Sequence, residues 1–514
     1  MNEEKKEKYE SNVCPICGRP AHKESRYCIF NASEDEKTQV EFIESLEEYI
    51  NRIKEEDKDY DFREFTFVGD IDFDMFFKVK IFKNANFEGV TFSGSANFIN
   101  TIFKGDTNFH NSKFMDVTCF WSTTFEERAD FKGASFNLST EFDHVFFMGL
   151  TDFRDAIFQD TTKYNHVNFN KYANFEEATF DLPVNFVGSI FEKDADFMRA
   201  TFNNDAIFLG VVFKWEIRFQ YATFNRIVSF DHAIFFPGRM LCLNVKKKGF
   251  IQFEGTFLEN INLILDIDRD VFINFNRAFL RNTKIKRDQI VGHILQEKNK
   301  DFFLAKDVYL LLKNNFHNIG RYDDESWAFK KEKDMDRMDK SFYCFLDKYK
   351  KYNQFKKILK KSNLLKRFIV KSKIFRKWLF SKKAIEWFNL SVSNFIYQYG
   401  ENPWRVIRFA LIVIFSFALI LNLSGIVNSD RTNLIIELLK ESHGDEYTLR
   451  YLGPILGSFL NCLYSSVVTF TTLGYGDFQP AVGASRFFVS LEAIIGAFTM
   501  ALFVYTFARR TGGR

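Results

Sequence analysis

Aromatic residues recur along the middle of the chain at a fixed spacing. From Phe87 an aromatic residue stands at every eleventh position as far as Phe230, and a second series with the same step runs from Phe92 to Phe235. Successive aromatic residues are therefore separated alternately by 5 and 6 positions. This spacing fits neither the period of a helix, about 3.6 residues, nor the two-residue period of an extended strand. A small or β-branched residue two positions before many of the aromatics, such as Ala195, provides a second inward-facing position.

Two inward residues followed by a turn every five or six residues predict a coil with four faces. Faces of 5, 6, 5 and 6 residues give 22 residues per coil, so the fourteen 11-residue units form seven regular coils. The segment 195–202, ADFMRATF, closely resembles the pentapeptide-repeat family. This resemblance implies a right-handed quadrilateral β-helix filled by stacked Phe rings. We place the β-helix, with looser capping coils at both ends, over residues 61–286.

Helical patterns flank this β-helix. An amphipathic helix is expected within residues 36–60, because apolar residues recur at helical spacing from Val40 to Ile53. Residues 287–338 change to the pattern of a helical hairpin joined near Gly320. The fold class is therefore mixed, with a β-helix, a helical linker and, as shown next, a two-helix pore-loop membrane domain.

The segment 339–403 is strongly basic and is expected to form juxtamembrane helices. Between Lys348 and Lys383 it holds fifteen Lys and Arg and no acidic residue, interleaved with apolar side chains. This mixture is typical of a helix lying on anionic membrane lipids, and nucleic-acid binding is less favoured because an apolar span follows directly. Part of the segment could instead dock on the β-helix, whose residues 87–235 include 20 acidic and 12 basic side chains. The lipid-facing charges are expected to include Lys366, Arg367, Lys371, Lys373, Arg376 and Lys377.

Two long apolar segments follow. The outer span over 404–428 and the inner span over 485–510 are each long enough to cross a bilayer core of about 30 Å. Arg408 stands near the start of the first span and Arg509 at the end of the second. The positive-inside rule therefore predicts a multi-pass cell-membrane protein with both termini in the cytoplasm and with residues 429–453 outside.

Between the spans, residues 454–484 contain an apolar stretch followed by the sequence TTLGYGD. With its neighbours this stretch resembles the selectivity filter of two-transmembrane pore-loop potassium channels, although Leu473 stands where Val or Ile is commoner. The resemblance implies a re-entrant pore helix, a homotetramer and K⁺ as the permeant ion, held by backbone carbonyl oxygens. Non-helical backbone at membrane depth itself requires several chains to meet around a water-filled path. The expected filter residues are Thr471, Thr472, Leu473, Gly474, Tyr475, Gly476 and Asp477.

The inner span carries the gating candidates. Glu492 is an acidic residue inside an apolar segment. Gly496 resembles the hinge glycine of this channel family, and close packing between helices is its alternative role. Phe503 or Phe507 would narrow the cytoplasmic mouth of the pore. No run of arginines at every third position precedes the pore, so we expect no voltage sensor.

Three of the seven cysteines cluster near the start of the chain. Cys14 and Cys17 form a Cys-x-x-Cys knuckle, and Cys28 is the natural third thiolate for a structural Zn²⁺ within residues 1–35. His22 is the nearest candidate for the fourth ligand, and a distant residue or a second chain are the alternatives.

Together these patterns predict a potassium-selective, non-voltage-gated homotetrameric channel with cytoplasmic β-helical arms. No catalytic set or nucleotide loop is visible, so we do not expect an enzyme. A poorly selective cation channel is the alternative within the same class. A membrane-tethered scaffold whose β-helix binds a protein partner is the alternative from a different class.

Overall fold

The computed structural model describes residues 13–78, 80–246, 248–350, 364–424, 426–427, 448–474, 479–480 and 483–512. The chain divides into two compact units, Met1–Glu325 and Ser326–Arg514.

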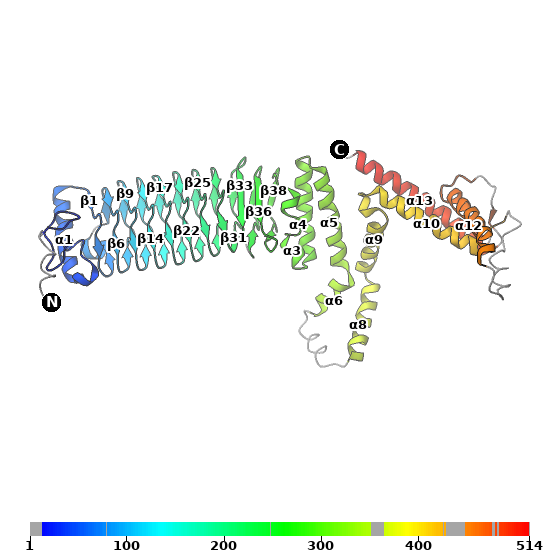
Figure 1. The fold of residues 1–514 in the computed structure, drawn as a ribbon, viewed down its shortest axis with the longest axis horizontal. Coiled ribbons are helices and arrows are strands. Elements are labelled where there is room, and N and C mark those ends of the chain that lie inside the picture. The colour runs from blue at the N-terminus through cyan, green and yellow to red at the C-terminus, as the bar shows by residue number, and fades with distance from the viewer. Residues whose placement is uncertain are drawn as a thin grey trace. The chain divides into compact units, whose positions relative to one another are not determined.

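The first unit is built around a parallel β-solenoid, which confirms the predicted fold class (Figure 1). Its strands form four sheets, one of 8 and three of 10 strands, and most strands pair with the strand four places further along the chain. The sheets run from β1 (Tyr60–Asp61) to β29 (Ile217–Arg218), from β2 (Thr66–Phe67) to β36 (Asn262–Ile267), from β3 (Ile71–Asp72) to β37 (Phe272–Asn274), and from β4 (Ile81–Phe82) to β38 (Phe279–Arg281).

The coil length is the predicted 22 residues. Phe114 of β10 (Lys113–Phe114) lies opposite Phe92 in one neighbouring coil and opposite Phe136 in the other. The register loosens at the ends, where Phe67 pairs with Phe92 and Val228 pairs with Ile251. The looser flanking coils extend the seven regular ones, so that three of the sheets contain ten strands each.

The alternation of 5 and 6 residues has its cause in two kinds of corner. Every eleventh residue from Gly89 to His232 has a positive φ, between 55° and 67°. At the first of these corners, the Val90 N–H donates to the Phe87 carbonyl at 3.2 Å, and a positive φ at the third residue is the mark of a type II turn. This tight turn occupies the five-residue step, and the bend that follows Phe92 occupies the six-residue step.

Stacked aromatic rings fill the solenoid, as the pattern predicts. Rings in the same column of successive coils lie parallel; Phe136 and Phe158, for example, are 4.8 Å apart at 1°. Rings on opposite faces meet edge to face, as in Phe131 and Phe142 at 5.7 Å and 88°. Both arrangements are favourable for aromatic quadrupoles, and all four rings are fully buried.

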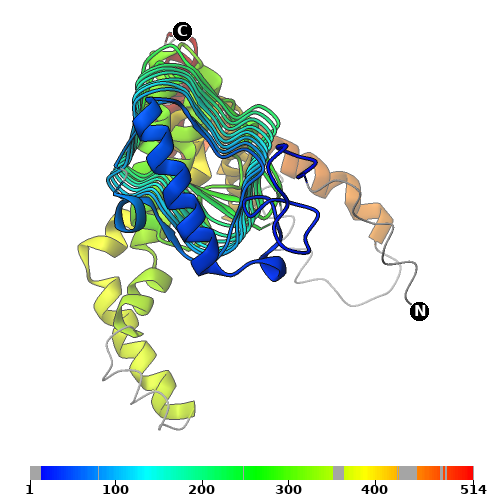
Figure 2. The same ribbon diagram turned by 90° about the vertical axis from the view of Figure 1, so that its left-hand side faces the viewer.

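A helix covers the first coil. After η1 (Glu34–Glu36), helix α1 (Gln39–Glu56) lies across the end of the stack (Figure 2). Its Phe42 meets Phe67 edge to face at 5.4 Å, and the Tyr49 hydroxyl donates to the Asp61 carbonyl at 2.7 Å. Val40, expected on the buried side, is 66% exposed because it lies two positions before the buried Phe42, on the opposite side of the helix. The short helix α2 (Phe73–Phe77) follows β3.

The last coil is also covered by helix. After η2 (Arg287–Gln289) and α3 (Leu295–Lys298), helix α4 (Phe302–Asn318) packs on β38. The buried Asn315 side chain accepts from the Thr283 N–H at 2.9 Å and donates to the Thr283 carbonyl at 2.8 Å. These bonds satisfy backbone groups that another strand would otherwise pair. A turn with Gly320 at φ 72° leads into α5 (Tyr322–Lys340).

The second unit contains the rest of α5 and the remaining helices. Two of them are long and apolar enough to cross a membrane, over Pro403–Leu423 and Ala484–Thr511. A two-residue antiparallel pair joins β39 (Ile426–Val427) and β40 (Gln479–Pro480). The helices are α6 (Phe342–Lys350), α8 (Leu364–Leu379), α9 (Lys382–Tyr397), η3 (Gln398–Gly400), α10 (Pro403–Ser424), α12 (Thr448–Phe470) and α13 (Ala484–Gly512).

Candidate ion pore and cysteine cluster

The described part of the predicted filter continues directly from the end of α12. The Leu473 N–H donates to the Val468 carbonyl at 3.1 Å. Thr472 and Gly474 both have φ of 59°, and Leu473 between them is not in the left-handed region. Such a φ is strained for a β-branched residue like Thr. When left-handed residues alternate with residues of negative φ, successive backbone carbonyl groups can face the same side. Tyr475, Gly476 and Asp477 lie outside the described residues.

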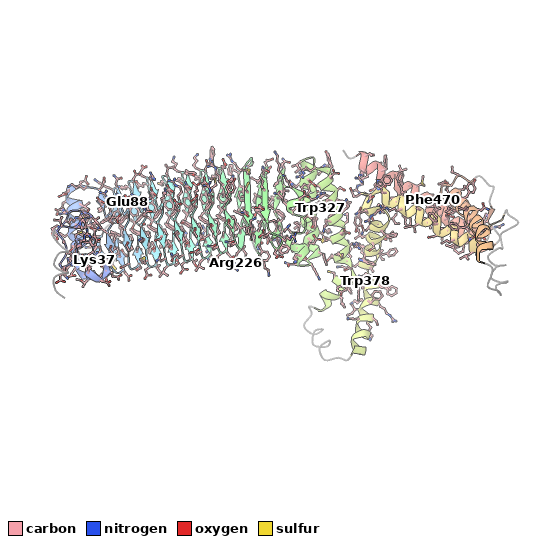
Figure 3. The ribbon with its side chains drawn as sticks, in the orientation of Figure 1. Lys37, Glu88, Arg226, Trp327, Trp378 and Phe470 are labelled. Atoms are coloured by element: carbon pink, nitrogen blue, oxygen red, sulfur yellow. The ribbon has the colours of Figure 1, made fainter. Side chains whose placement is uncertain are left out.

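Three helices pack around the residue that directly precedes this segment. Phe470, the last residue of α12, is only 2% exposed (Figure 3). The residue directly before the filter is therefore fixed by packing among α10, α12 and α13. Its buried neighbours are Val413, Ile414 and Phe417 of α10.

Gly496 of α13 packs directly against the end of α12. A Cβ atom on Gly496 would lie 2.1 Å from the carbonyl oxygen of Phe470 and 2.8 Å from its carbonyl carbon. No side chain fits at this distance. Close packing between the two helices therefore explains why glycine occupies position 496, without any hinge motion. The helix α13 continues through Gly496 without interruption.

Glu492 joins the same three helices through one buried hydroxyl. The Ser466 Oγ of α12 contacts both the Glu492 carboxyl of α13 and, at 2.9 Å, the Ile414 carbonyl of α10. Ser466 and Glu492 are fully buried. A hydroxyl has a single proton, so Ser466 either shares it between the two acceptors or donates to Ile414 and accepts from a protonated Glu492. The predicted intramembrane acid is therefore buried where α10, α12 and α13 meet.

The two aromatic candidates for the pore mouth lie one turn apart on α13. The ring centroids of Phe503 and Phe507 are 6.1 Å apart, and Phe507 is 53% exposed in the single chain. Whether these rings narrow the cytoplasmic mouth of a pore depends on neighbouring chains, so this role stays a prediction.

Comparisons with known protein families decide the class of this region. Residues 447–512 match a family model described as "Ion channel". The C-terminal part of the chain is an ion-channel domain. Residues 76–119 and 164–212 match the model described as "Pentapeptide repeats (9 copies)", which confirms the resemblance of the solenoid. No curated protein and no solved structure matches the chain significantly.

The ion-channel match and the two apolar helices make this chain a membrane protein. The match includes α12, the predicted filter and α13, and it begins after α10. The channel domain is thus joined in one chain to a pentapeptide-repeat β-helix.

At the other end of the chain, the structure brings together the three predicted cysteines. The Sγ atoms of Cys14, Cys17 and Cys28 all lie within 4.8 Å of one another, and those of Cys17 and Cys28 are 3.4 Å apart. Thiolates that share a tetrahedral Zn²⁺ at about 2.3 Å lie at comparable separations. Burial alone would raise the pKa of Cys14, but the N–H groups of the knuckle and of Cys28 that face its sulfur lower it below the ordinary value.

His22, the expected fourth ligand, is not part of this cluster. Its Nε2 lies 4.0 Å from the Glu41 carboxylate, and the side chain that faces the sulfurs is Asn31. Asn31 Oδ1 lies 3.0 Å from Cys28 Sγ and 3.6 Å from Cys14 Sγ. The Asn31 Nδ2 donates to the Glu64 carbonyl at 2.8 Å, which fixes Oδ1 toward the sulfurs. The sequence analysis considered only the usual metal-binding residue types, and it therefore did not identify Asn31, whose side chain is an amide.

Lys37 is a second residue that the sequence analysis missed. Its Nζ donates to the carbonyls of Ile29 and Thr66, both at 2.7 Å, and lies 4.4 Å from the centre of the Phe42 ring. Burial lowers the pKa of Lys37 to about 7. These contacts connect the cysteine-containing segment 14–31 to the first coil and to α1; Figure 3 labels Lys37 near the start of the chain.

The basic juxtamembrane segment only partly follows the predicted lipid-facing arrangement. Lys371, Lys373, Arg376 and Lys377 are exposed on α8, and the side chains of Lys366 and Arg367 lie outside the described residues. Part of the apolar side of α8, however, packs on protein. Trp378 is buried, donates to the Lys340 carbonyl at 3.0 Å and lies 5.6 Å from Trp387. The exposed apolar residues continue on α9, as Ile385, Phe388, Val392 and Phe395.

Proposed function

We propose that the protein is a potassium-selective, non-voltage-gated channel that forms a homotetramer, with the β-helix as its cytoplasmic arm and both termini in the cytoplasm. The observation that carries the proposal is the backbone at Thr472–Gly474, where left-handed residues flank Leu473 at the end of a supported helix. Carbonyl groups that face one side can replace the hydration shell of K⁺ when several chains surround one axis. The C-terminal end of α12 adds a partial negative charge that favours a cation.

Exposed apolar side chains support the assembly of several chains. In the single chain only 17% of the apolar window of α13 is buried, compared with 33% for α10. Leu473 of the filter is 60% exposed, and Phe498 of α13 is 69% exposed. A pore-lining helix and filter need partners that the single chain does not provide. Four copies around one axis supply those partners, and α10 then lies on the outside of the assembly, in contact with lipid.

Two further parts of the proposal concern the cytoplasmic side. A structural Zn²⁺ is held by Cys14, Cys17 and Cys28, with Asn31 Oδ1 in the fourth position. The lysines and arginines of α8 and the exposed apolar stripe of α9 contact anionic lipid next to the membrane.

The test is current through the purified full-length protein in planar bilayers under opposed K⁺ and Na⁺ gradients. We expect a reversal potential close to the potassium equilibrium potential. Gly474→Ser should abolish selectivity or current, because Gly474 has a positive φ within the filter. Gly457→Ser is the matched control: Gly457 lies in α12, and a Cβ there meets nothing within 4 Å.

Each outcome separates the proposed function from its alternatives. A reversal potential that does not shift toward potassium supports a poorly selective cation channel. A protein that reconstitutes but carries no current under any stimulus supports the scaffold, whose β-helix would then bind a protein partner. Normal selectivity in Gly474→Ser would contradict the filter assignment.

A further inference from the structure

The inner helix ends in a charged residue that is held by two distant parts of the chain. Arg509, in the last turn of α13, pairs with the Glu401 carboxylate at 3.0 Å between Nη2 and Oε1. Its Nη1 donates to the Tyr399 carbonyl at 3.2 Å. Its guanidinium lies 4.4 Å from the centre of the Phe329 ring. We refer to Arg509 with Glu401, Tyr399 and Phe329 as the Arg509 clamp.

The partners of Arg509 are themselves fixed. The second Glu401 oxygen accepts from Ser326 Oγ at 2.5 Å, and the Glu401 side chain is only 14% exposed. The Tyr399 hydroxyl donates to Asp334 at 2.9 Å. Gly400 has φ of 93°, a conformation that favours glycine, and a Cβ there would lie 3.1 Å from Arg509 Nη1. The clamp is therefore a built site and not a chance surface pair.

The clamp connects three elements with different roles. Tyr399 and Glu401 stand just before α10, Ser326 and Phe329 belong to α5, and Arg509 belongs to α13. Any displacement of the end of α13 away from η3 separates the guanidinium from Glu401. The clamp therefore stabilises the position of α13 in this structure over any position in which that end has moved.

We propose that Arg509 is a positioning residue of the channel gate, and that the clamp sets the equilibrium between two positions of the inner helix that differ in conduction. The inference rests on the proposed function, because α13 gates only if it lines a pore. Helix α5 begins at Tyr322, in the first unit, and contributes Phe329 to the clamp, so the continuous chain of α5 connects that unit to the clamp.

The test is the ratio of open to closed time in single-channel recordings of the full-length protein. We would compare Arg509→Gln, Glu401→Gln, the double variant and the exchange Arg509→Glu with Glu401→Arg. Each single variant should shift the ratio in the same direction, by about fivefold or more. The double variant should shift it by less than the product of the two single effects, and the exchange should restore part of the wild-type ratio. Unit conductance and reversal potential should not change, because the filter is untouched.

Arg510→Gln is the matched control for charge. It removes the same charge at the neighbouring position, and Arg510 is exposed, with no clamp contact among the described residues. An Arg510→Gln shift as large as that of Arg509→Gln would overturn the proposal in favour of a surface-charge effect. Independent, multiplicative effects of Arg509→Gln and Glu401→Gln would also overturn it, as would wild-type gating in both. Absence of wild-type current would instead refute the proposed function itself.

Discussion

Tyr164 provides a direct test of how the solenoid core is stabilised. It occupies a position where the same column has Phe in the neighbouring coils, and its ring stacks on Phe142 and on Phe186, each at 4.7 Å. The residue is fully buried, and its hydroxyl has no hydrogen-bond partner within the described residues. Burial raises the pKa of this hydroxyl well above its ordinary value. We therefore expect Tyr164→Phe to stabilise the solenoid.

The magnitude follows from the cost of an unsatisfied polar group. A buried hydroxyl without a partner costs about 1–3 kcal/mol. Removing it leaves the ring stack intact, because Phe occupies the equivalent positions in neighbouring coils. Loss of a few oxygen contacts offsets part of this gain, so the expected stabilisation is about 1–2 kcal/mol. Such a change lowers the population of the locally opened state by roughly 5- to 30-fold.

Hydrogen exchange measured by mass spectrometry on the full-length protein in detergent resolves this effect. Amides of peptides that span Phe153 to Phe175 should exchange more slowly in Tyr164→Phe than in the wild type. Phe120→Tyr is the matched control, since Phe120 lies in the same column and stacks on Phe98 and Phe142 at 4.8 and 4.9 Å. It should accelerate exchange around its own coil. Equal or faster exchange in Tyr164→Phe would refute the reasoning that the buried hydroxyl is unsatisfied.

Three other predictions concern the pore helix, the cysteine cluster and the first helix. Gly496→Ala should abolish current while Gly457→Ala does not, because a Cβ 2.1 Å from the Phe470 oxygen requires α12 to move by more than about 1 Å; wild-type current in Gly496→Ala would refute it. In metal analysis of the purified protein, Asn31→Ala should weaken zinc retention about tenfold or more while His22→Ala does not, and the reverse result would restore His22 as the ligand. Hydrogen bonds from Lys23 and from Thr38 lower the pKa of Glu41 to about 2, below its ordinary value of 4.5. Protonation as pH falls from about 4.5 to 2 therefore removes stability from the start of α1. Exchange there, corrected for the intrinsic rate, should rise over this range, and Glu41→Gln should not show the rise.

The architecture of the solenoid could be predicted from the sequence because its determinants are local and repeated. Each coil buries the same positions, so a spacing of 5 and 6 residues between aromatics identifies the faces and the 22-residue coil. The two apolar helices and the pore motif could be predicted for a similar reason, because length, polarity and closely spaced glycines are properties of short segments. The type II corners are harder to see, because their left-handed positions accept residues as different as Gly133, His144 and Arg199.

Contacts between residues far apart in the chain were decided by the tertiary structure alone. The approach of Gly496 to Phe470 depends on how two helices cross, and it gives that glycine a packing role that sequence alone could not separate from a hinge. The position of Asn31 Oδ1 beside the cysteine sulfurs depends on a bond from Asn31 to Glu64, 33 positions away. The Arg509 clamp joins positions 329, 401 and 509, which no periodicity connects. Repeated local burial is encoded in the order of residues along the chain, whereas a site built from several elements exists only once those elements have packed.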